Sequence, residues 1–202
     1  MREPVIVVEH MEGGGSRWLV EEYVEAFESV NGLGLRFVVS GVRDHVLGAV
    51  LSRRGVPWVW EHAWELGCRD PVIVLDMRAP RVLEPWEARA ASCLVVGGIM
   101  GDHPPRGRGM LLVWGFPGAS VRSLGEMQMS VHTASVVAAM IARRRRLVDI
   151  GLVGPGRFTI RGPLGEIEVE LPYAYLAGRD GSPVVPERIR RVLERGVMWD
   201  EV

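Results

Sequence analysis

The sequence contains no lysine, and all 24 of its positively charged residues are arginine. Cysteine is almost absent: Cys68 and Cys93 are the only two, and they lack the CxxC or Cys/His spacing of a zinc site. This scarcity excludes a disulfide-rich framework and predicts no metal site. We expect two free, buried thiols in a reducing compartment.

Long hydrophobic runs are also missing, since no apolar stretch is long enough to span a membrane. The first residues, Met1 to Pro4, lack the pattern of a signal peptide. We therefore predict a cytoplasmic protein without membrane segments. The formal net charge of -1 implies no global attraction to nucleic acid. With 202 residues, of which 48% are hydrophobic, the chain can bury the core of one large domain or of a domain with a small appendage.

Short apolar, β-branched runs alternate with helical patterns over the first 150 residues. The predicted strands are Val5–Val8, Leu35–Ser40, Val72–Leu75, Cys93–Val96 and Met110–Trp114. The predicted helices are Ser16–Val30, Asp44–Arg53 and a long one from a Ser130 cap to Arg146. This alternation is typical of an α/β fold with a parallel sheet.

The pattern changes after residue 150. Phe158–Ile160 and Glu166–Glu170 alternate like exposed strands around a Gly-Pro turn, and a last helix is predicted from Pro186 to Arg195. We therefore predict an α/β core over residues 1–150 and a β appendage with a terminal helix over residues 151–202, packed on the core.

Four polar segments follow predicted strands, which is where parallel sheets bind their ligands. They are Glu9–Glu12, Asp76–Arg78, Gly97–Arg108 and Leu124–Gln128. In the third segment, glycines allow the main chain to approach a ligand closely, and Pro104-Pro105 fixes the exit of the loop. The segment lacks GxGxxG spacing and follows the fourth strand, which argues against a Rossmann nucleotide site.

Several of these strings together resemble one family. They are Glu9-His10-Met11-Glu12, Asp76-x-Arg78-Ala79, Gly97-Gly98-Ile99-x-Gly101-Asp102-His103-Pro104-Pro105-Arg106, Leu124-Gly125-x-x-Gln128-Met129 and Leu171-Pro172-x-x-Tyr175. In this order they resemble the SPOUT-class protein-arginine methyltransferases known from fungi, with archaeal relatives. The resemblance implies a SPOUT-type parallel sheet with a C-terminal deep trefoil knot and S-adenosylmethionine (SAM) as methyl donor. It also implies an arginine of a small-subunit ribosomal protein as acceptor.

The two glycine-containing loops supply the predicted cofactor-binding residues. These are Val96, Gly97, Gly98, Ile99, Gly101, Asp102, His103, Pro104, Leu124, Gly125, Gln128, Met129 and Ser130. For Ser130 we favour a simple helix cap. Arg78, Arg106 and Arg108 are candidates for the SAM carboxylate, for phosphates of an RNA acceptor, or for salt bridges to nearby acids.

An arginine acceptor favours carboxylate partners, because a guanidinium pairs with them in a bidentate way. We predict substrate-binding roles for Glu9, Glu12, Asp76, Arg78 and Arg106, and catalytic roles for Glu9, Glu12, Asp102 and His103. The alternative for Glu9 and Glu12 is a helix cap or a pair with Arg78 or Arg106.

Other chemically active residues have structural interpretations that we favour. His10 and His132 are predicted to be structural, and Arg143–Arg146 to be a solvated helix end. Trp58, Trp60 and Trp64 lie in an apolar stretch, which favours core packing over base stacking.

The leading hypothesis is thus a SAM-dependent methyltransferase that acts on a protein arginine. One alternative is a SAM-dependent methyltransferase of rRNA or tRNA. The other is a SAM-binding ribosome-assembly protein without turnover. We expect a monomer, and a dimer stays open.

Overall fold

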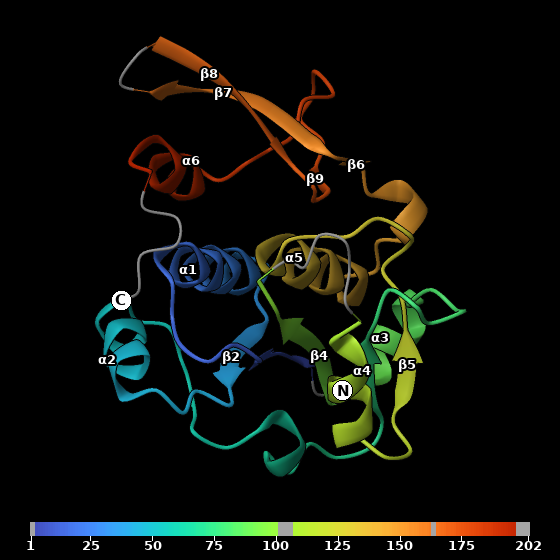
Figure 1. Cartoon of the computed structure of the whole chain (residues 1–202). Helices are drawn as coiled ribbons and strands as arrows, with labels where there is room; N and C mark the ends of the chain where they lie inside the picture. Colours follow the sequence, from blue (N-terminus) through green and yellow to red (C-terminus); the bar gives the residue numbers. More distant parts are fainter. Residues whose placement is uncertain (1–2, 101–106, 163–164, 197–202) are drawn as a thin grey trace.

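Five strands form one parallel sheet in the computed structural model, which describes residues 3–100, 107–162 and 165–196 (Figure 1). The sheet order is β2-β1-β4-β3-β5. The bounds are β1 Val5–His10, β2 Arg36–Ser40, β3 Val72–Leu75, β4 Cys93–Gly98 and β5 Ser120–Arg122. In the centre, Val8 of β1 lies between Val39 and Val96. The predicted α/β class and the parallel sheet are confirmed.

Alternation along the strands divides the core into two faces. Ile6 and Val8 pack against α1 (Arg17–Gly32) and α5 (Val131–Ala142), which lie side by side in Figure 1, and α2 (His45–Arg53) and α3 (Pro85–Ala90) complete that side. Val7 faces the other way, toward η1 (Ala63–Glu65) and α4 (Gly109–Gly115). The sheet is therefore covered on both faces, as continuous apolar strands require.

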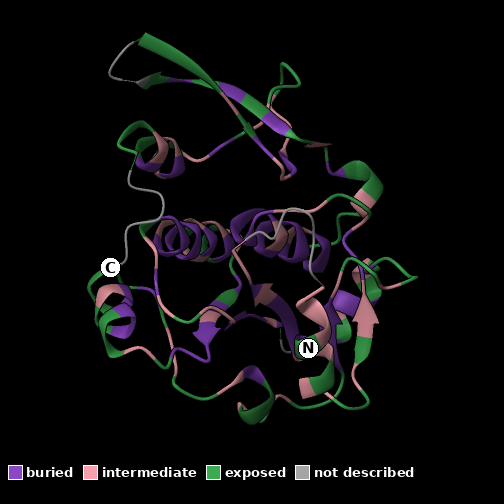
Figure 2. Cartoon of the chain, in the orientation of Figure 1, coloured by how far each residue is buried: buried purple, intermediate pink, exposed green. Residues whose placement is uncertain are grey.

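The last part of the chain packs on α1. It contains η2 (Leu147–Asp149), β6 (Leu152–Val153), β7 (Gly156–Gly162), β8 (Gly165–Leu171), β9 (Tyr175–Leu176) and α6 (Glu187–Glu194). Trp18 of α1 shares a buried cluster with Phe158, Tyr175 and Ile189, while much of the β7–β8 hairpin is exposed (Figure 2). The predicted hairpin and terminal helix are confirmed, and the division into two units at residue 150 stays a prediction.

The predicted strand Met110–Trp114 is wrong. These residues form α4, and the fifth strand is β5, which pairs with β3. Leu112 is buried beneath the sheet, whereas Leu111 and Trp114 are exposed. A run this short and this apolar has no periodicity that separates a strand from a helix. Its packing against the sheet therefore determines which of the two it forms.

The helix predicted to reach Arg146 ends at Ala142. Arg144 adopts a φ of 75°, in the left-handed region that a helix cannot continue through. Arg143 binds the carbonyls of Leu33 and Gly34, and Arg146 pairs with Asp149. All four arginines are exposed, so the predicted solvated helix end is confirmed.

The two cysteines are joined by a disulfide, so the prediction of free thiols is wrong. Cys68 lies in the loop before β3 and Cys93 begins β4, with their Cα atoms 6.1 Å apart. A separation of 25 residues without a motif gave no sign of this proximity. The cysteines consequently no longer argue for a reducing compartment.

Core packing was also the wrong expectation for two of the three tryptophans. Trp58 packs against the main core and donates a hydrogen bond to Ser52. Trp60 and Trp64 are about two-fifths exposed, at 42% and 40%; Trp64 stacks on the His62 ring, and Trp60 contacts the His45 ring at a tilt of 34°. In the part of the chain that the structure describes, no helix is long and apolar enough to cross a membrane.

Candidate functional site

A cavity of about 170 Å³ opens at the carboxyl ends of β3 and β4, beside the loop that connects β5 to α5. Its wall combines main chain from the glycine loops with apolar side chains and a few charged ones. The residues that line it are Leu75, Asp76, Met77, Arg78, Val96, Gly97, Ile99, Gly107, Arg108, Gly109, Leu112, Leu124, Gly125, Met127, Gln128, Met129, Ser130, Val131 and Ala134. The cavity therefore lies where the rule for parallel sheets predicts a ligand site.

Most of the predicted cofactor residues meet in this cavity. Those on its wall are Val96, Gly97, Ile99, Leu124, Gly125, Gln128, Met129 and Ser130, together with the predicted substrate residues Asp76 and Arg78. Gly101, Asp102, His103, Pro104 and Arg106 lie outside the described residues. Leu112, Val131 and Ala134 were missed because they belong to helices rather than to loops.

Gly98 does not line the cavity, although it was predicted to bind the cofactor. A Cβ at this position would lie 2.6 Å from the Tyr23 hydroxyl and 2.7 Å from the Glu9 carbonyl oxygen. Glycine is therefore required here for close packing against β1 and α1. We propose no cofactor-binding role for Gly98.

Glu12 joins the loops that follow β1 and β4. Its Oε1 accepts a hydrogen bond from the Met100 amide at 2.7 Å and lies 2.9 Å from Nη1 of Arg108. Arg108 also donates to the Met100 carbonyl at 3.1 Å. Glu12 itself is not on the cavity wall, but it holds Arg108, which is. The expected pairing of Glu12 with an arginine is thus present, with Arg108 as the partner.

Glu9 faces away from both the cavity and the glycine loops. Its carboxylate accepts hydrogen bonds from Ser40 at 2.7 Å and from the Ala63 amide at 2.8 Å, and lies 2.5 Å from Nδ1 of His62. Only 1% of its surface is exposed, and it lines neither this cavity nor the second one described below. Glu9 holds η1 against the sheet, and these contacts support a structural role in place of the catalytic and substrate-binding roles predicted for it.

Ser130 caps α5, as favoured from the sequence. Its hydroxyl accepts a hydrogen bond from the Thr133 amide at 3.2 Å. The two histidines are structural as well: Nδ1 of His10 lies 2.8 Å from the Tyr23 hydroxyl, and Nε2 of His132 lies 3.3 Å from the Ser29 hydroxyl. Burial lowers the pKa of both rings, to about 4 for His132.

A second cavity of about 220 Å³ adjoins the first. It is lined by Trp18, Leu19, Glu22, Ile99, Met100, Met129, Ser130, Val131, Leu171, Pro172 and Tyr173. Four of these residues, Ile99, Met129, Ser130 and Val131, line the first cavity too. Glu22 was not among the predicted site residues, although it falls four residues after Trp18 and three after Leu19, on the apolar stripe of α1.

Among the described residues, no group of three or more His, Cys, Asp or Glu side chains could hold a metal ion.

The family model described as "Protein arginine N-methyltransferase SFM1-like" matches residues 5–198. The chain belongs to this family. Protein arginine N-methyltransferase SFM1 of Saccharomyces cerevisiae is 28% identical over 202 residues, which cover 94% of this chain and 93% of the yeast protein. The crystal structure of the yeast enzyme complexed with SAM matches with a TM-score of 0.84 and 26% identity, over 98% of this chain and 92% of that one.

A more distant match extends beyond the SFM1-like family. The crystal structure of a dual specific Trm10 from Thermococcus kodakaraensis matches with a TM-score of 0.54 at 12% identity, over 72% of this chain and 96% of that one. At this identity the likeness concerns the fold alone, and it agrees with the SPOUT-type sheet expected from the sequence. The resemblance drawn from the loop motifs is confirmed by the family match.

Proposed function

We propose that this chain is a SAM-dependent methyltransferase that acts on an arginine side chain of a protein. The supporting observation is the first cavity, where eight residues predicted to bind the cofactor meet at the carboxyl ends of β3 and β4 in an SFM1-like chain. The solved yeast relatives are complexed with SAM and with its demethylated product SAH.

The wall of the first cavity fits the parts of SAM. Leu124, Met129 and Ala134 offer an apolar surface for the purine, and Asp76 offers a carboxylate for ribose hydroxyls. Gly125, at a φ of 97°, turns the chain where a larger residue would be strained. Arg78 and Arg108 provide cations for the amino-acid carboxylate.

When bound, SAM supplies an electrophilic methyl group on a sulfonium. The protein then has to fix the donor, align the acceptor nitrogen with the methyl carbon and exclude water. The loop after β4, the loop after β5 and the N-terminus of α5 fix the donor. Their main chain is held in place by the two strands and by the Ser130 cap. Glu12 fixes Arg108 at the rim of the cavity.

We extend the proposal to an arginine of a small-subunit ribosomal protein, as the family resemblance implies. The same resemblance supports a deep trefoil knot and a monomer. We also propose the cytoplasmic location that was expected from the sequence. Intracellular disulfides are common in hyperthermophiles, so the Cys68–Cys93 bond is compatible with a cytoplasmic site in such a cell.

The test is an incubation of the purified protein with methyl-labelled SAM and small ribosomal subunits, followed by separate protease and ribonuclease digestions. We expect label that protease releases and ribonuclease does not. Label released only by ribonuclease would assign the chain to RNA. Absence of label, with SAM binding intact, would favour a non-catalytic assembly protein.

A further inference from the structure

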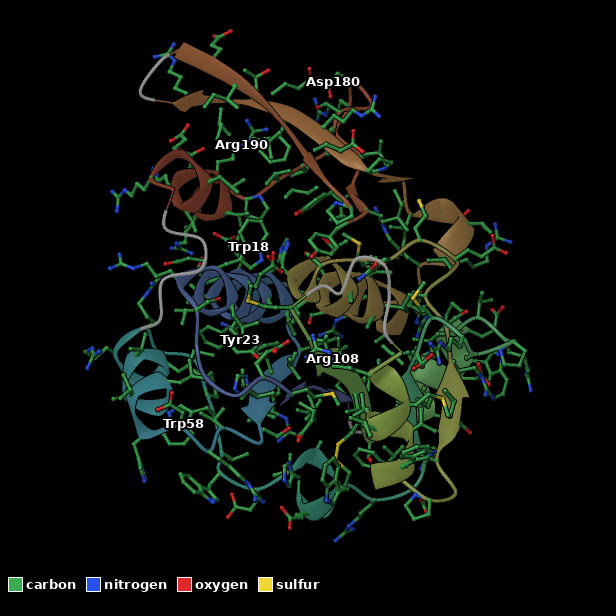
Figure 3. The ribbon with its side chains drawn as sticks, in the orientation of Figure 1. Trp18, Tyr23, Trp58, Arg108, Asp180 and Arg190 are labelled. Atoms are coloured by element: carbon green, nitrogen blue, oxygen red, sulfur yellow. A yellow bond between two sulfur atoms is a disulfide. The ribbon has the colours of Figure 1, made fainter. Side chains whose placement is uncertain are left out.

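The second cavity has two walls of different origin. Trp18, Leu19 and Glu22 come from the first turns of α1, while Leu171, Pro172 and Tyr173 follow from the end of β8. Ile99, Met129, Ser130 and Val131 separate it from the first cavity and line both. In Figure 3, Trp18 lies on the side of α1 that faces the C-terminal strands. A group in the second cavity would consequently adjoin a ligand in the first.

Glu22 is the acidic residue on this wall, and it is 1% exposed. Its Oε2 accepts a hydrogen bond from the His132 amide at 2.7 Å. Its Oε1 has no hydrogen-bond partner in the described part of the chain. A buried carboxylate oxygen without a donor is costly, so native proteins usually pair such an atom with a protein group, an ordered water or a bound ligand.

A second buried polar atom without a hydrogen-bond partner lies near Glu22. The Tyr175 hydroxyl also lacks a partner within the described ranges, and it is close enough that the charge of Glu22 raises its pKa further above the value set by burial. Burial raises the pKa of Glu22 to about 7, although the His132 amide and the Ser130 hydroxyl act in the opposite direction. Of these two groups, Glu22 lines the cavity, so its wall holds one unused acceptor in a largely apolar setting.

The remaining wall suits a planar cation. Trp18 and Tyr173 present aromatic rings, and Leu171 and Pro172 add apolar surface. A guanidinium stacks on aromatic faces and donates in its plane to a carboxylate, whereas an ammonium offers only a compact, strongly hydrated charge. Carboxylate and aromatic groups at one cavity therefore favour an arginine side chain over a lysine.

We propose that the second cavity binds the guanidinium of the acceptor arginine and that Glu22 pairs with it and takes up its proton. This inference rests on the proposed function and names its acceptor subsite. Glu12 is less suited to the role because Arg108 already neutralises it, and Glu9 lines neither cavity.

The proton and electron balance of the reaction requires such a group. One guanidinium N–H proton passes to the Glu22 carboxylate, which frees a nitrogen lone pair. That pair forms the bond to the methyl carbon while the carbon–sulfur bond breaks and the sulfur keeps its electrons. The products are a methylguanidinium, a neutral thioether and a protonated Glu22, which later releases its proton to solvent.

The first experiment compares the wild type with Glu22→Gln. Glutamine retains the shape and can still accept the His132 hydrogen bond, but it cannot take up the proton. Glu28→Gln is the matched control, because Glu28 lies on the exposed side of the same helix and pairs with Arg188. We expect kcat/KM for the protein acceptor to fall about 100-fold or more in Glu22→Gln. The dissociation constant for SAM and the circular dichroism spectrum should stay the same in both variants.

A direct binding measurement makes the proposal independent of turnover. Ethylguanidinium, titrated into the full chain saturated with S-adenosylhomocysteine and followed by NMR, should bind the wild type and Glu28→Gln but not Glu22→Gln. Ethylammonium should bind at least tenfold more weakly.

The two proposals fail in different ways. Arginine methylation by Glu22→Gln within twofold of the wild type would overturn the role of Glu22 and leave the proposed function intact. A wild type that labels only RNA would overturn the proposed function, whether or not ethylguanidinium binds. Ethylguanidinium binding that Glu22→Gln leaves unchanged would overturn the subsite.

Discussion

The carboxylate of Glu22 accepts a hydrogen bond from the backbone N–H of His132 at 2.7 Å. This bond joins α1 to the first turn of α5, whose N-terminal amides favour a negative charge. It also leaves one carboxylate oxygen free at the cavity wall. Glu22 therefore has both a structural contact and an unused acceptor.

Replacing Glu22 by glutamine should stabilise the protein at alkaline pH. The pKa of Glu22 is about 7 in the folded chain, against 4.5 as its ordinary value, so the folded state holds its proton more tightly than the unfolded state does. This contribution is complete below pH 4.5 and is lost as pH rises through 7. The loss is on the order of 3 kcal/mol, at about 1.4 kcal/mol for each pKa unit.

Thermal melting of the wild type and Glu22→Gln at pH 5 and pH 8 checks this. The difference in free energy of unfolding between the variant and the wild type should move in favour of the variant between the two pH values. An identical difference at both would contradict the buried ionisation of Glu22.

The pH dependence of activity should follow the same group. Its charged or titratable neighbours are Glu25, which acts against its ionisation, Tyr23 and Tyr175, whose raised pKa values keep them neutral, and His132, neutral above about 4. We expect kcat/KM for the protein acceptor to rise with pH and to level off above about 7. The residual activity of Glu22→Gln should lack this inflection. A wild-type profile of kcat/KM that is flat from pH 5.5 to 8.5 would contradict the role of Glu22 as the proton acceptor.

Filling the first cavity should abolish donor binding. Ala134 of α5 lies on its wall, so a phenyl ring in Ala134→Phe would occupy the space assigned to SAM. We predict an increase of about 100-fold or more in the dissociation constant for SAM, measured by calorimetry, with a melting temperature near that of the wild type. Unchanged affinity would move the donor to another site.

The link between Glu12 and Arg108 should matter for donor affinity rather than for folding. Glu12→Gln can keep the hydrogen bond from the Met100 amide but loses the charge opposite Arg108. We expect SAM to bind about three- to tenfold more weakly, because Arg108 would lose the ion pair that helps to hold it at the cavity rim. Glu126→Gln, at an exposed glutamate next to the same cavity, is the control and should have no effect. An equal loss in both variants would point to general charge instead.

Much of the fold could be predicted because its causes are local. Continuous β-branched runs predicted β1, β3 and β4, and the Ser16 and Ser130 caps predicted where α1 and α5 begin. The glycine loops were placed at the cavity because strand ends of a parallel sheet share one edge. These features depend on a few neighbouring residues each.

The features that were missed depend on contacts distant in sequence. Cys68 meets Cys93 only because β3 and β4 are neighbours in the sheet. The segment Met110–Trp114 is helical because Leu112 packs against one face of the sheet. Glu22 was not predicted either, because its burial depends on the packing of α1 against α5. Its position between Trp18 and Ala26 on the buried stripe was the available signal.

The Cys68–Cys93 bond closes a loop of 25 residues and should therefore stabilise the fold. In the chain-entropy account a loop of this length corresponds to about 3–4 kcal/mol. Cys68→Ser should lower the free energy of unfolding by about that amount in denaturant titrations, and a reducing agent should have the same effect on the wild type. Equal midpoints with and without reducing agent would show that the bond does not form in solution.

The chemical identity of the methylated residue decides between the possible acceptors. The purified chain is incubated with methyl-labelled SAM and small ribosomal subunits, and the protein fraction is hydrolysed and separated beside amino-acid standards. We predict that the label co-elutes with methylarginine and that Glu22→Gln removes it. Label that elutes with another amino acid, or that stays with the RNA fraction, would contradict arginine methylation by this chain.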